Sequence, residues 1–249
     1  MRFVKISSLI LSLAATLGVV PAFGATCSTA SLNGVFGFID AGYDSSGEHG
    51  ASVGQITYDG KGKVTGAFTH SHTGTISTLT FKGTYSVAKN CTGSIVETQS
   101  NSVKQTNNFV IDNGDDGTQF ILTDSGQIET GFSLAQGTGT CGLTGKAQTF
   151  AVSLIGPNAV LGPVAYVDQL ILNGKGKISG SGSSSIAGSI HKGTITGTYT
   201  EAADCTGTLQ FTPPGGNLSN FNFVVVNSGK ELLAIETDSG TTVFGNSQQ

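Results

Sequence analysis

Apolar and polar residues alternate in short runs along most of the chain, and strong helix formers never accumulate after residue 24. Such alternation is typical of strands, whose successive side chains point to opposite faces of a sheet. Short turns rich in Gly, Asp, Asn and Ser separate the runs, so we expect neighbouring strands to be antiparallel. In the first half of the chain the predicted strands are Val35–Ala41, Ala51–Tyr58, Lys63–His70, Thr75–Val87, Cys91–Thr98, Thr106–Ile111, Thr118–Thr123 and Gln127–Leu134.

The second half of the chain repeats the first at a constant offset. Cys141 follows Cys27 by 114 positions, and Cys205 follows Cys91 by the same interval. The segments GTYSVAKNCTG and GTYTEAADCTG keep this offset, as do two copies of GKGK. We therefore predict a tandem duplication without insertions between these anchor points. The predicted units are a first copy at residues 25–136, a linker at 137–140 and a second copy at 141–249.

Eight short antiparallel strands in succession leave two unpaired sheet edges, which closure into a barrel removes. We predict an all-β protein made of two tandem eight-stranded antiparallel up-and-down barrels. The interior of such a barrel is either filled with side chains or able to hold one small ligand. A single outer-membrane barrel of sixteen strands is the alternative architecture. It requires strands of about 9–11 residues, and most of the predicted runs are shorter.

Each copy carries one early cysteine and one mid-unit cysteine. If each copy folds by itself, the disulfides are Cys27–Cys91 and Cys141–Cys205. Each bond then closes a long loop, and the chain-entropy estimate for its stabilising effect is about 4 kcal/mol.

The N-terminal segment differs in composition from the rest of the chain. Arg2 and Lys5 precede the apolar run Leu9–Val20, which Pro21 and small residues follow. This order is typical of a secretory signal peptide, predicted at residues 1–24. The run is shorter than the roughly 20 apolar residues of a membrane anchor. We expect a secreted or periplasmic protein with no membrane span after removal of the signal.

Charge restricts the classes of partner. The chain has 12 basic and 16 acidic residues, a formal net charge of −4 at pH 7, and no cluster of Lys and Arg. Phosphate backbones are bound by such clusters, so we predict no nucleic-acid partner. The two GKGK segments begin with the glycines of the dipeptides Asp59-Gly60 and Asn173-Gly174 and lead into β-branched residues rather than a helix. They are interpreted as hairpin turns and not as phosphate-binding loops.

Two groups of polar residues suggest chemistry. Asp124 and Asp238 lie in DSG motifs that resemble the catalytic motif of aspartic proteases, in which two carboxyls share a proton. The competing interpretation, which we favour, places both in turns, where Asp and Gly are preferred.

His70 and His72 point the same way on a strand. They either hold a metal ion together with Glu48 or His49, or face solvent. We favour the solvent-facing interpretation, so the predicted site contains no metal, no cofactor and no catalytic residue.

Aromatic residues on the inward face are the best candidates for ligand contacts. On the fourth predicted strand, Leu79, Phe81, Gly83 and Tyr85 share one face, which alternation places inside the barrel. A fully packed interior is the alternative, in which buried tyrosine hydroxyls bond only to backbone carbonyls. The candidate ligand-binding residues are Tyr58, Phe81, Tyr85, Phe109, Phe120 and Tyr199.

The layout of each copy resembles the calycin group, which contains the lipocalin-like and avidin-like barrels. A cysteine precedes SLNGVFGF, a DG turn and GTY follow, and the second cysteine comes at mid-unit. The repeated pattern is also similar to that of uncharacterised exported bacterial proteins. The resemblance implies an eight-stranded barrel with an internal disulfide that holds a small ligand. The chain has no Trp, so the resemblance does not extend to the tryptophans of the avidin biotin site.

We therefore expect an exported protein of the cell envelope or exterior that binds a small hydrophobic molecule. One alternative is a structural or surface-interaction protein with filled barrels and no ligand. A second alternative is a cyclase-like barrel enzyme, although a function without catalysis is favoured. An enzyme requires a titratable residue inside a cavity. Glu97 and Glu236 are the best candidates for it, and neither has an acidic equivalent in the other copy.

Overall fold

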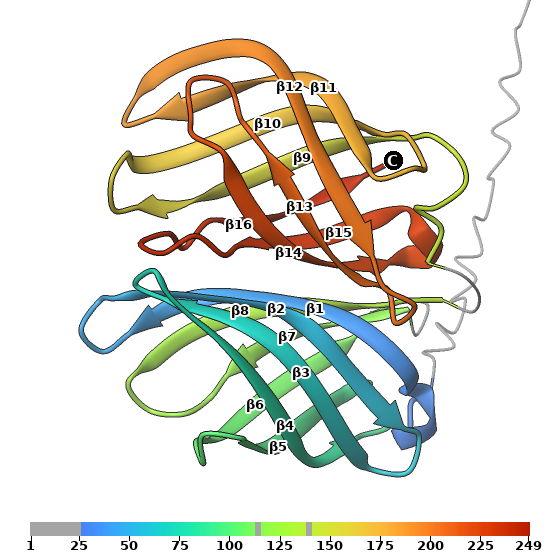
Figure 1. Ribbon diagram of the computed structural model, residues 1–249. Helices are drawn as coiled ribbons and strands as arrows, with labels where there is room; N and C mark the ends of the chain where they lie inside the picture. The colour runs from blue at the N-terminus through green and yellow to red at the C-terminus, as the bar shows by residue number, and fades with distance from the viewer. Residues whose placement is uncertain (1–25, 113–115, 138–140) are drawn as a thin grey trace, which may run out of the picture.

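The computed structural model describes residues 26–112, 116–137 and 141–249. The predicted signal segment at 1–24, like most of the predicted linker, lies outside the described residues. Within them, sixteen strands form two closed antiparallel barrels (Figure 1). The predicted fold class is confirmed, because the strands close into two barrels of eight and not into one barrel of sixteen. These barrels fit a calycin-like fold.

Barrel 1 contains strands β1 to β8, arranged around the barrel in chain order. Antiparallel pairing of β8 with β1, from Phe36 opposite Ala135 to Asp44 opposite Gln127, closes the sheet. Number and order of strands agree with the sequence pattern, but several strands are longer than predicted because ladder pairing continues into polar hairpin ends. The strands are β1 (Asn33–Asp44), β2 (His49–Asp59), β3 (Lys63–His72), β4 (Thr75–Val87), β5 (Thr92–Gln99), β6 (Lys104–Ile111), β7 (Gly117–Leu122) and β8 (Gln127–Ala135).

Barrel 2 repeats this arrangement, and pairing of β16 with β9 closes its sheet. Its strands are β9 (Gln148–Asn158), β10 (Gly162–Leu172), β11 (Lys177–Ile186), β12 (Ser189–Glu201), β13 (Thr206–Phe211), β14 (Ser219–Val226), β15 (Glu231–Glu236) and β16 (Phe244–Gln248). Two short 3-10 turns, η1 (Thr29–Ser31) and η2 (Asn227–Gly229), accompany the strands. No helix among the described residues is long and apolar enough to cross a membrane.

The two GKGK segments are hairpin turns, as predicted. The Oδ1 atom of Asp59 accepts hydrogen bonds from the backbone N–H groups of Lys61 and Lys63 at 2.7 and 2.8 Å. Asn173 repeats this arrangement in barrel 2. The following Gly60 has a positive φ of 70°, a conformation that glycine adopts without strain. Neither segment leads into a helix.

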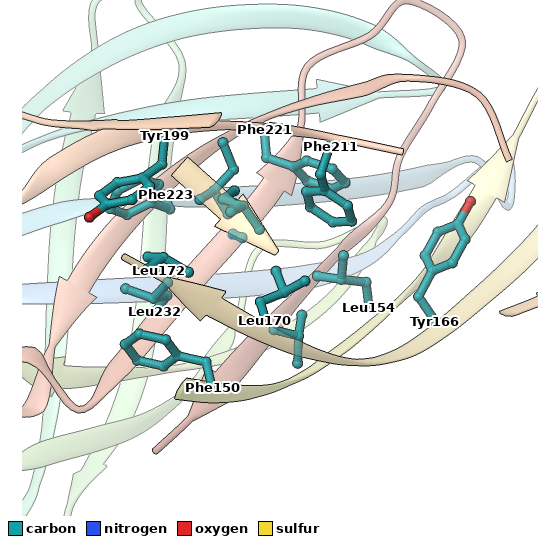
Figure 2. Packing of buried hydrophobic residues seen from close by; sticks show 14 of the residues in the cluster. Phe150, Leu154, Tyr166, Leu170, Leu172, Tyr199, Phe211, Phe221, Phe223 and Leu232 are labelled. Carbon is teal, nitrogen blue, oxygen red and sulfur yellow. The ribbon is translucent and has the colours of Figure 1, made fainter. Parts of the chain in front are cut away.

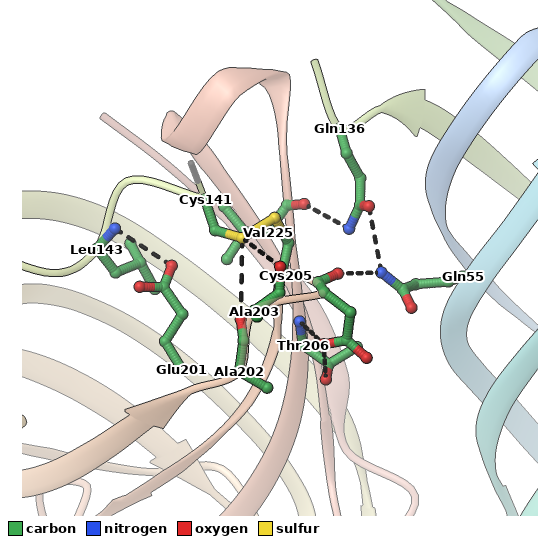
Figure 3. The surroundings of a disulfide bond; sticks show 11 residues. Gln55, Gln136, Cys141, Leu143, Glu201, Ala202, Ala203, Cys205, Thr206 and Val225 are labelled. Carbon is green, nitrogen blue, oxygen red and sulfur yellow. Dashed lines mark hydrogen bonds between the residues drawn. A yellow bond between two sulfur atoms is a disulfide. The ribbon is translucent and has the colours of Figure 1, made fainter. Parts of the chain in front are cut away.

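The disulfides are Cys27–Cys91 and Cys141–Cys205, one in each barrel, as predicted. Each joins the segment before the first strand of its barrel to the turn after the fourth strand. Figure 3 shows the second bond, whose Cys141 lies beside the carbonyl groups at the end of β12. Each bond therefore fixes the closed end of its barrel, opposite the hairpins that join the first strand to the second and the third to the fourth.

The barrels pack against each other through different faces. Barrel 1 contributes the outer faces of β1, β2 and β8, and barrel 2 contributes those of β14 and β15 (Figure 1). The Nδ2 atom of Asn222 donates a hydrogen bond to Thr69 Oγ1 at 2.9 Å, and Ser71 Oγ donates one to the carbonyl oxygen of Thr241 at 2.6 Å. The buried apolar residues of this inter-barrel interface are Ile39, Ala51, Val53, Val224, Val226, Leu233 and Ile235.

Candidate ligand-binding cavity in barrel 1

A cavity of about 370 Å³ lies inside barrel 1. At one end its lining includes residues at hairpin ends, among them Asp44, His72 and Asn101. At the other end the barrel is closed by buried Leu32, the residue that follows η1. The cavity is therefore a pocket that opens at the end opposite the disulfide.

Four phenylalanines form an apolar wall of this cavity. The rings of Phe38 and Phe68 lie 6.0 Å apart between centroids, as do those of Phe68 and Phe81, and Phe120 lies 6.5 Å from Phe38. They come from four strands, β1, β3, β4 and β7, because alternation turns every second side chain inward. The wall therefore presents ring faces and edges to whatever occupies the cavity.

Three carboxyl groups also face this cavity: Asp40 on β1, Glu97 on β5 and Glu129 on β8. Asp40 shares the inward face of β1 with Phe38, and β8 pairs directly with β1, so Asp40 and Glu129 belong to one wall. Glu97 belongs to a strand that pairs with neither β1 nor β8. Asp40 is 7% exposed and Glu97 is 8% exposed, so both lie in the barrel interior and not at its rim.

Burial changes the protonation of these carboxyls. Burial, with a smaller contribution from the charge of the nearby Glu129, raises the pKa of Glu97 to about 7. Burial likewise raises the pKa of Glu129 to about 7. The pKa of Asp40 is raised well above its ordinary value, first by burial and then by the charge of Glu129. The loss of hydration and the mutual repulsion both disfavour the charged forms, so the empty cavity retains protons near neutral pH.

Two buried polar atoms of the cavity lining have no hydrogen-bond partner among the described residues. They are Oδ1 of Asp40 and Oδ1 of Asn107, whose residues are 7% and 9% exposed. A buried polar atom without a partner costs about 1–3 kcal/mol. Gln99 and Gln105, also at the cavity, bond to each other at 2.6 Å. The cavity thus combines an apolar wall with acceptor atoms that are available to a ligand.

The two predicted histidines lie on the cavity side of β3, and the solvent-facing interpretation of them is wrong for His70. That residue lines the cavity, and its Nδ1 atom lies 3.1 Å from Ser52 Oγ. Burial lowers the pKa of His70, and the neighbouring His72 lowers it further. The two rings are stacked, with centroids 6.2 Å apart.

Asp44, Glu48 and His72 form a cluster at the mouth of the cavity, called here the rim cluster. Nε2 of His72 lies 3.3 Å from Asp44 Oδ2 and 3.8 Å from Glu48 Oε2. Within the described part of the chain, this is the group of three whose ligand atoms lie close enough together to hold one metal ion. Asp44 Oδ1 already accepts hydrogen bonds from the backbone N–H groups of Ser46 and Glu48, so the cluster has a sufficient structural role in the β1–β2 turn.

The structure brings three of the six predicted ligand-binding residues together at the cavity: Tyr58, Phe81 and Phe120. The other three lie away from it. Phe109 is buried in the apolar cluster of barrel 1, where its ring lies against Gly93.

Tyr85 and Tyr199 support the closed ends of the barrels. The hydroxyl of Tyr85 lies 2.9 and 2.8 Å from the carbonyl oxygens of Thr29 and Leu32, and that of Tyr199 donates to the Leu143 carbonyl at 2.9 Å. Both tyrosine hydroxyls therefore bond to backbone carbonyls in the apolar ends of the barrels.

Barrel 2 has the same strands but a filled interior (Figure 2). At the constant offset, the positions of Asp40, Glu97 and Glu129 are occupied by Leu154, Phe211 and Val243. All three replacements belong to the buried apolar cluster of barrel 2. Figure 2 shows Leu154 and Phe211 within this cluster, and the ring of Phe211 stacks on that of Phe221 at 5.1 Å.

The mouth of barrel 2 is also covered. Pro213 and Pro214 occupy the positions of Gln99 and Ser100, and both prolines are buried. Because proline cannot donate to a sheet ladder, β13 ends at Phe211, whereas its counterpart β5 continues to Gln99. The Pro214 carbonyl accepts a hydrogen bond from Ser184, the residue at the position of His70.

Two buried carboxyls remain in barrel 2. Burial raises the pKa of Asp168 to about 6 and that of Glu236 to about 7. Neither lines the cavity of barrel 1. Of the two residues considered from the sequence for catalysis, Glu97 therefore lies in the cavity and Glu236 does not.

The two DSG motifs are turns that follow β7 and β15. Oδ2 of Asp124 accepts the backbone N–H of Thr106 at 2.9 Å, and Oδ2 of Asp238 accepts that of Asn220 at 2.8 Å. Each carboxylate therefore bonds to the start of β6 or β14, the strand that pairs with the one preceding its turn.

Sequence reasoning missed Asp40 and Glu129. A charged residue on a half-buried strand is usually interpreted as facing outward. Comparison of the two copies identifies them, because each acid of the first copy aligns with an apolar residue in the second.

No protein-family model matches the chain, and no curated protein matches it.

Proposed function

We propose that the chain is an exported small-molecule-binding protein in which barrel 1 binds the ligand and barrel 2 is a packed companion. The observation that carries this proposal is the cavity of about 370 Å³ in barrel 1, at positions that buried side chains fill in barrel 2. Its volume falls in the range of ligand pockets, about 300–1,000 Å³. An apolar wall with a few convergent polar groups is the usual composition of such pockets.

The interior polar groups support a binding role over a structural one. A barrel that serves only as a scaffold is more stable with a filled interior, as barrel 2 illustrates. Buried polar atoms without a partner occur in both barrels, on Asp168 and Glu236 of barrel 2 as well, but in barrel 1 those of Asp40 and Asn107 belong to residues that line a cavity, and each costs folding free energy. A ligand that donates hydrogen bonds to these atoms offsets that cost.

Export is supported by three independent features. The disulfides occur in two pairs, which is consistent with an oxidising, extracytoplasmic environment. The predicted signal segment at 1–24 is the second feature, and the resemblance of each copy to calycin barrels and to exported bacterial proteins is the third.

Native mass spectrometry of protein purified from its own host tests the proposal. The expected result is a co-purifying small molecule that dissociates on unfolding. Glu97→Phe places the side chain of its barrel 2 equivalent, Phe211, in the cavity and should abolish the adduct. Ile128→Thr, at a residue 74% exposed on the outer face of β8, is the control that should retain it. Host-purified parent protein free of any adduct would contradict the proposal.

A second candidate function is acid–base catalysis in the same cavity. Carboxyls with a pKa of about 7, such as those of Glu97 and Glu129, can donate or accept a proton at neutral pH. Incubation of the protein with the co-purified molecule distinguishes the two. A binding protein returns the molecule unchanged, whereas an isomerase or cyclase converts it, and Glu97→Gln then stops the conversion.

A further inference from the structure

The cavity of barrel 1 is acidic without a matching positive charge from the protein. Its lining contains the carboxyls of Asp40, Asp44, Glu97 and Glu129, and it contains no Lys and no Arg. Of its two histidines, His70 has its pKa lowered by burial, and His72 lies at the rim beside Asp44 and Glu48, away from the interior carboxyls. Buried carboxylates are stable only when a cation or several hydrogen-bond donors accompany them. In this cavity the protein provides neither for Asp40 Oδ1.

From this imbalance we propose that the ligand of barrel 1 is an organic cation, with an ammonium group between the interior carboxyls and an apolar or aromatic body against the phenylalanine wall. This inference rests on the proposed function, since it names the class of ligand for the same cavity. It replaces a purely hydrophobic ligand with an amphipathic one.

A metal ion does not fit the interior carboxyls. Within the described residues, Asp40, Glu97 and Glu129 do not form a group whose oxygen atoms all lie within 4.8 Å of one another, whereas the rim cluster does. Their strands belong to different walls of the barrel. An ammonium group on a molecular body can hydrogen-bond to one wall while its remaining charge faces the other. The spread of the three carboxyls therefore favours an organic cation over a bare ion.

The aromatic wall suits the same ligand. Phe38, Phe68 and Phe81 lie together in one wall of the cavity, with mutual centroid distances of 6.0 to 6.2 Å. Phenyl rings attract cations through their faces and pack against other rings edge to face. The ammonium group and the apolar body of one molecule thus both find partners inside barrel 1.

Proton release accompanies binding if the ligand is a cation. The empty cavity holds protons on Glu97 and Glu129 near neutral pH, because burial raises the pKa of each to about 7. A bound ammonium group favours the ionised forms and lowers both pKa values. Affinity for the cation should therefore rise as pH increases from 5.5 to 8. The titratable groups that face these carboxyls from the surrounding strands are Asp40, Tyr43, Asp44, Tyr58, His70 and His72.

Isothermal titration calorimetry on the full chain with three matched probes tests the inference. The probes are 2-phenylethylamine, the neutral 2-phenylethanol and the anionic 3-phenylpropionate, each repeated with a naphthyl ring to vary size. At pH 8 we expect the amines to bind at least about tenfold more tightly than the alcohols. This is the ratio of dissociation constants that one additional charge-assisted hydrogen bond produces. The anions should not bind measurably. Between pH 8 and pH 5.5 the amine affinity should fall while the alcohol affinity stays constant.

Variants locate the effect. Glu97→Gln combined with Glu129→Gln should remove the preference for amines and its pH dependence while alcohols still bind. Glu236→Gln, which changes a buried carboxyl in barrel 2, is the matched control and should leave both unchanged. Since the pH dependence is measured on the parent protein, a variant that fails to fold leaves the test intact.

The outcomes separate the two proposals. Alcohols that bind as tightly as amines at pH 8 would overturn the cationic ligand and leave the binding function standing. Absence of binding by any probe, together with host-purified protein free of adducts, would overturn both. An amine preference that survives in the double variant would show that the interior carboxyls do not recognise the charge.

Discussion

Barrel 1 and barrel 2 share their strand order, hairpin turns and disulfide positions, yet their interiors differ. Asp40, Glu97 and Glu129 surround a cavity in the first, and the equivalent Leu154, Phe211 and Val243 are part of a filled core in the second. The comparison shows that the hairpin turns, the alternation of apolar and polar residues and the disulfide specify the barrel. The inward positions are free to vary, because either a packed or a hollow interior is compatible with the closed sheet.

The largest effect is expected from giving barrel 2 an acid of barrel 1. Phe211→Glu removes a fully buried ring and places a carboxyl among apolar side chains. Loss of the ring alone costs about 3–5 kcal/mol, and the buried carboxyl adds to this. Urea denaturation should show barrel 2 unfolding at a much lower concentration. The reciprocal change in barrel 1, Glu97→Phe, is the comparison and should not lower stability at pH 8; equal losses in both variants would contradict the difference between interiors.

Removal of one disulfide at a time should have the second-largest effect. Each bond spans a sequence separation of 64 residues, for which the chain-entropy estimate is about 4 kcal/mol. We expect the variant lacking Cys27–Cys91 to lose the barrel 1 cavity and ligand binding. The variant lacking Cys141–Cys205 should melt earlier but still bind, because the filled core of barrel 2 supports the sheet. Thermal scans combined with probe titration measure both; loss of binding in the second variant alone would refute this order.

The buried carboxyls should make barrel 1 less stable as pH rises. Glu97 has its pKa raised to about 7, above the value of an unfolded chain, about 4.3. Between these values the folded state binds more protons than the unfolded state, so stability decreases as pH increases from about 4.5 to 7. Glu97→Gln should therefore raise the stability of the empty protein at pH 8, by up to about 3 kcal/mol. Denaturation at pH 5 and pH 8 measures the change, and a variant no more stable than the parent at pH 8 would count against it.

The smallest predicted effect concerns the inter-barrel interface. A Cβ atom at Gly37 would lie 2.4 Å from Val226 Cγ1 of barrel 2, so Gly37→Ala should cost about 1–3 kcal/mol through overpacking. The equivalent position in barrel 2 is Ala151, which is exposed, and Ala151→Gly is the matched control. The first variant should weaken coupling between the unfolding transitions of the barrels. Unchanged coupling would indicate that the side chains shift without loss of contact.

Much of the fold could be predicted from the sequence because its causes are local. Alternation set the inward face of β4, where Phe81 and Tyr85 are buried as expected. The offset shared by Cys27 and Cys141 selected the disulfide pairing. The cavity depended on non-local facts, since only strand pairing brings Asp40 and Glu129 into one wall. Composition alone could not decide whether facing side chains meet or leave space between them.

The inter-barrel interface was not predicted, although the sequence contains a signal for it. The strands β14 and β15 read FNFVVV and ELLAIE over residues 221–226 and 231–236. Such continuous apolar runs indicate strands that are buried on both faces. One face packs inside barrel 2 and the other against barrel 1. What the runs could not reveal is which face of the other copy covers them.

Because the barrels meet through unlike faces, the contact is head-to-tail, and repetition of such a contact generates a ring if the rotation closes and an open filament if it does not. Nothing in the docking geometry itself would stop a third or fourth unit from joining. Polar replacements at the two free faces provide the stop. Gln119 stands at the position of Leu233 on one free face, and Ser153 stands at the position of Ile39 on the other. These polar side chains disfavour docking of a further barrel at either free face, and Gln119→Leu combined with Ser153→Ile should promote association between chains.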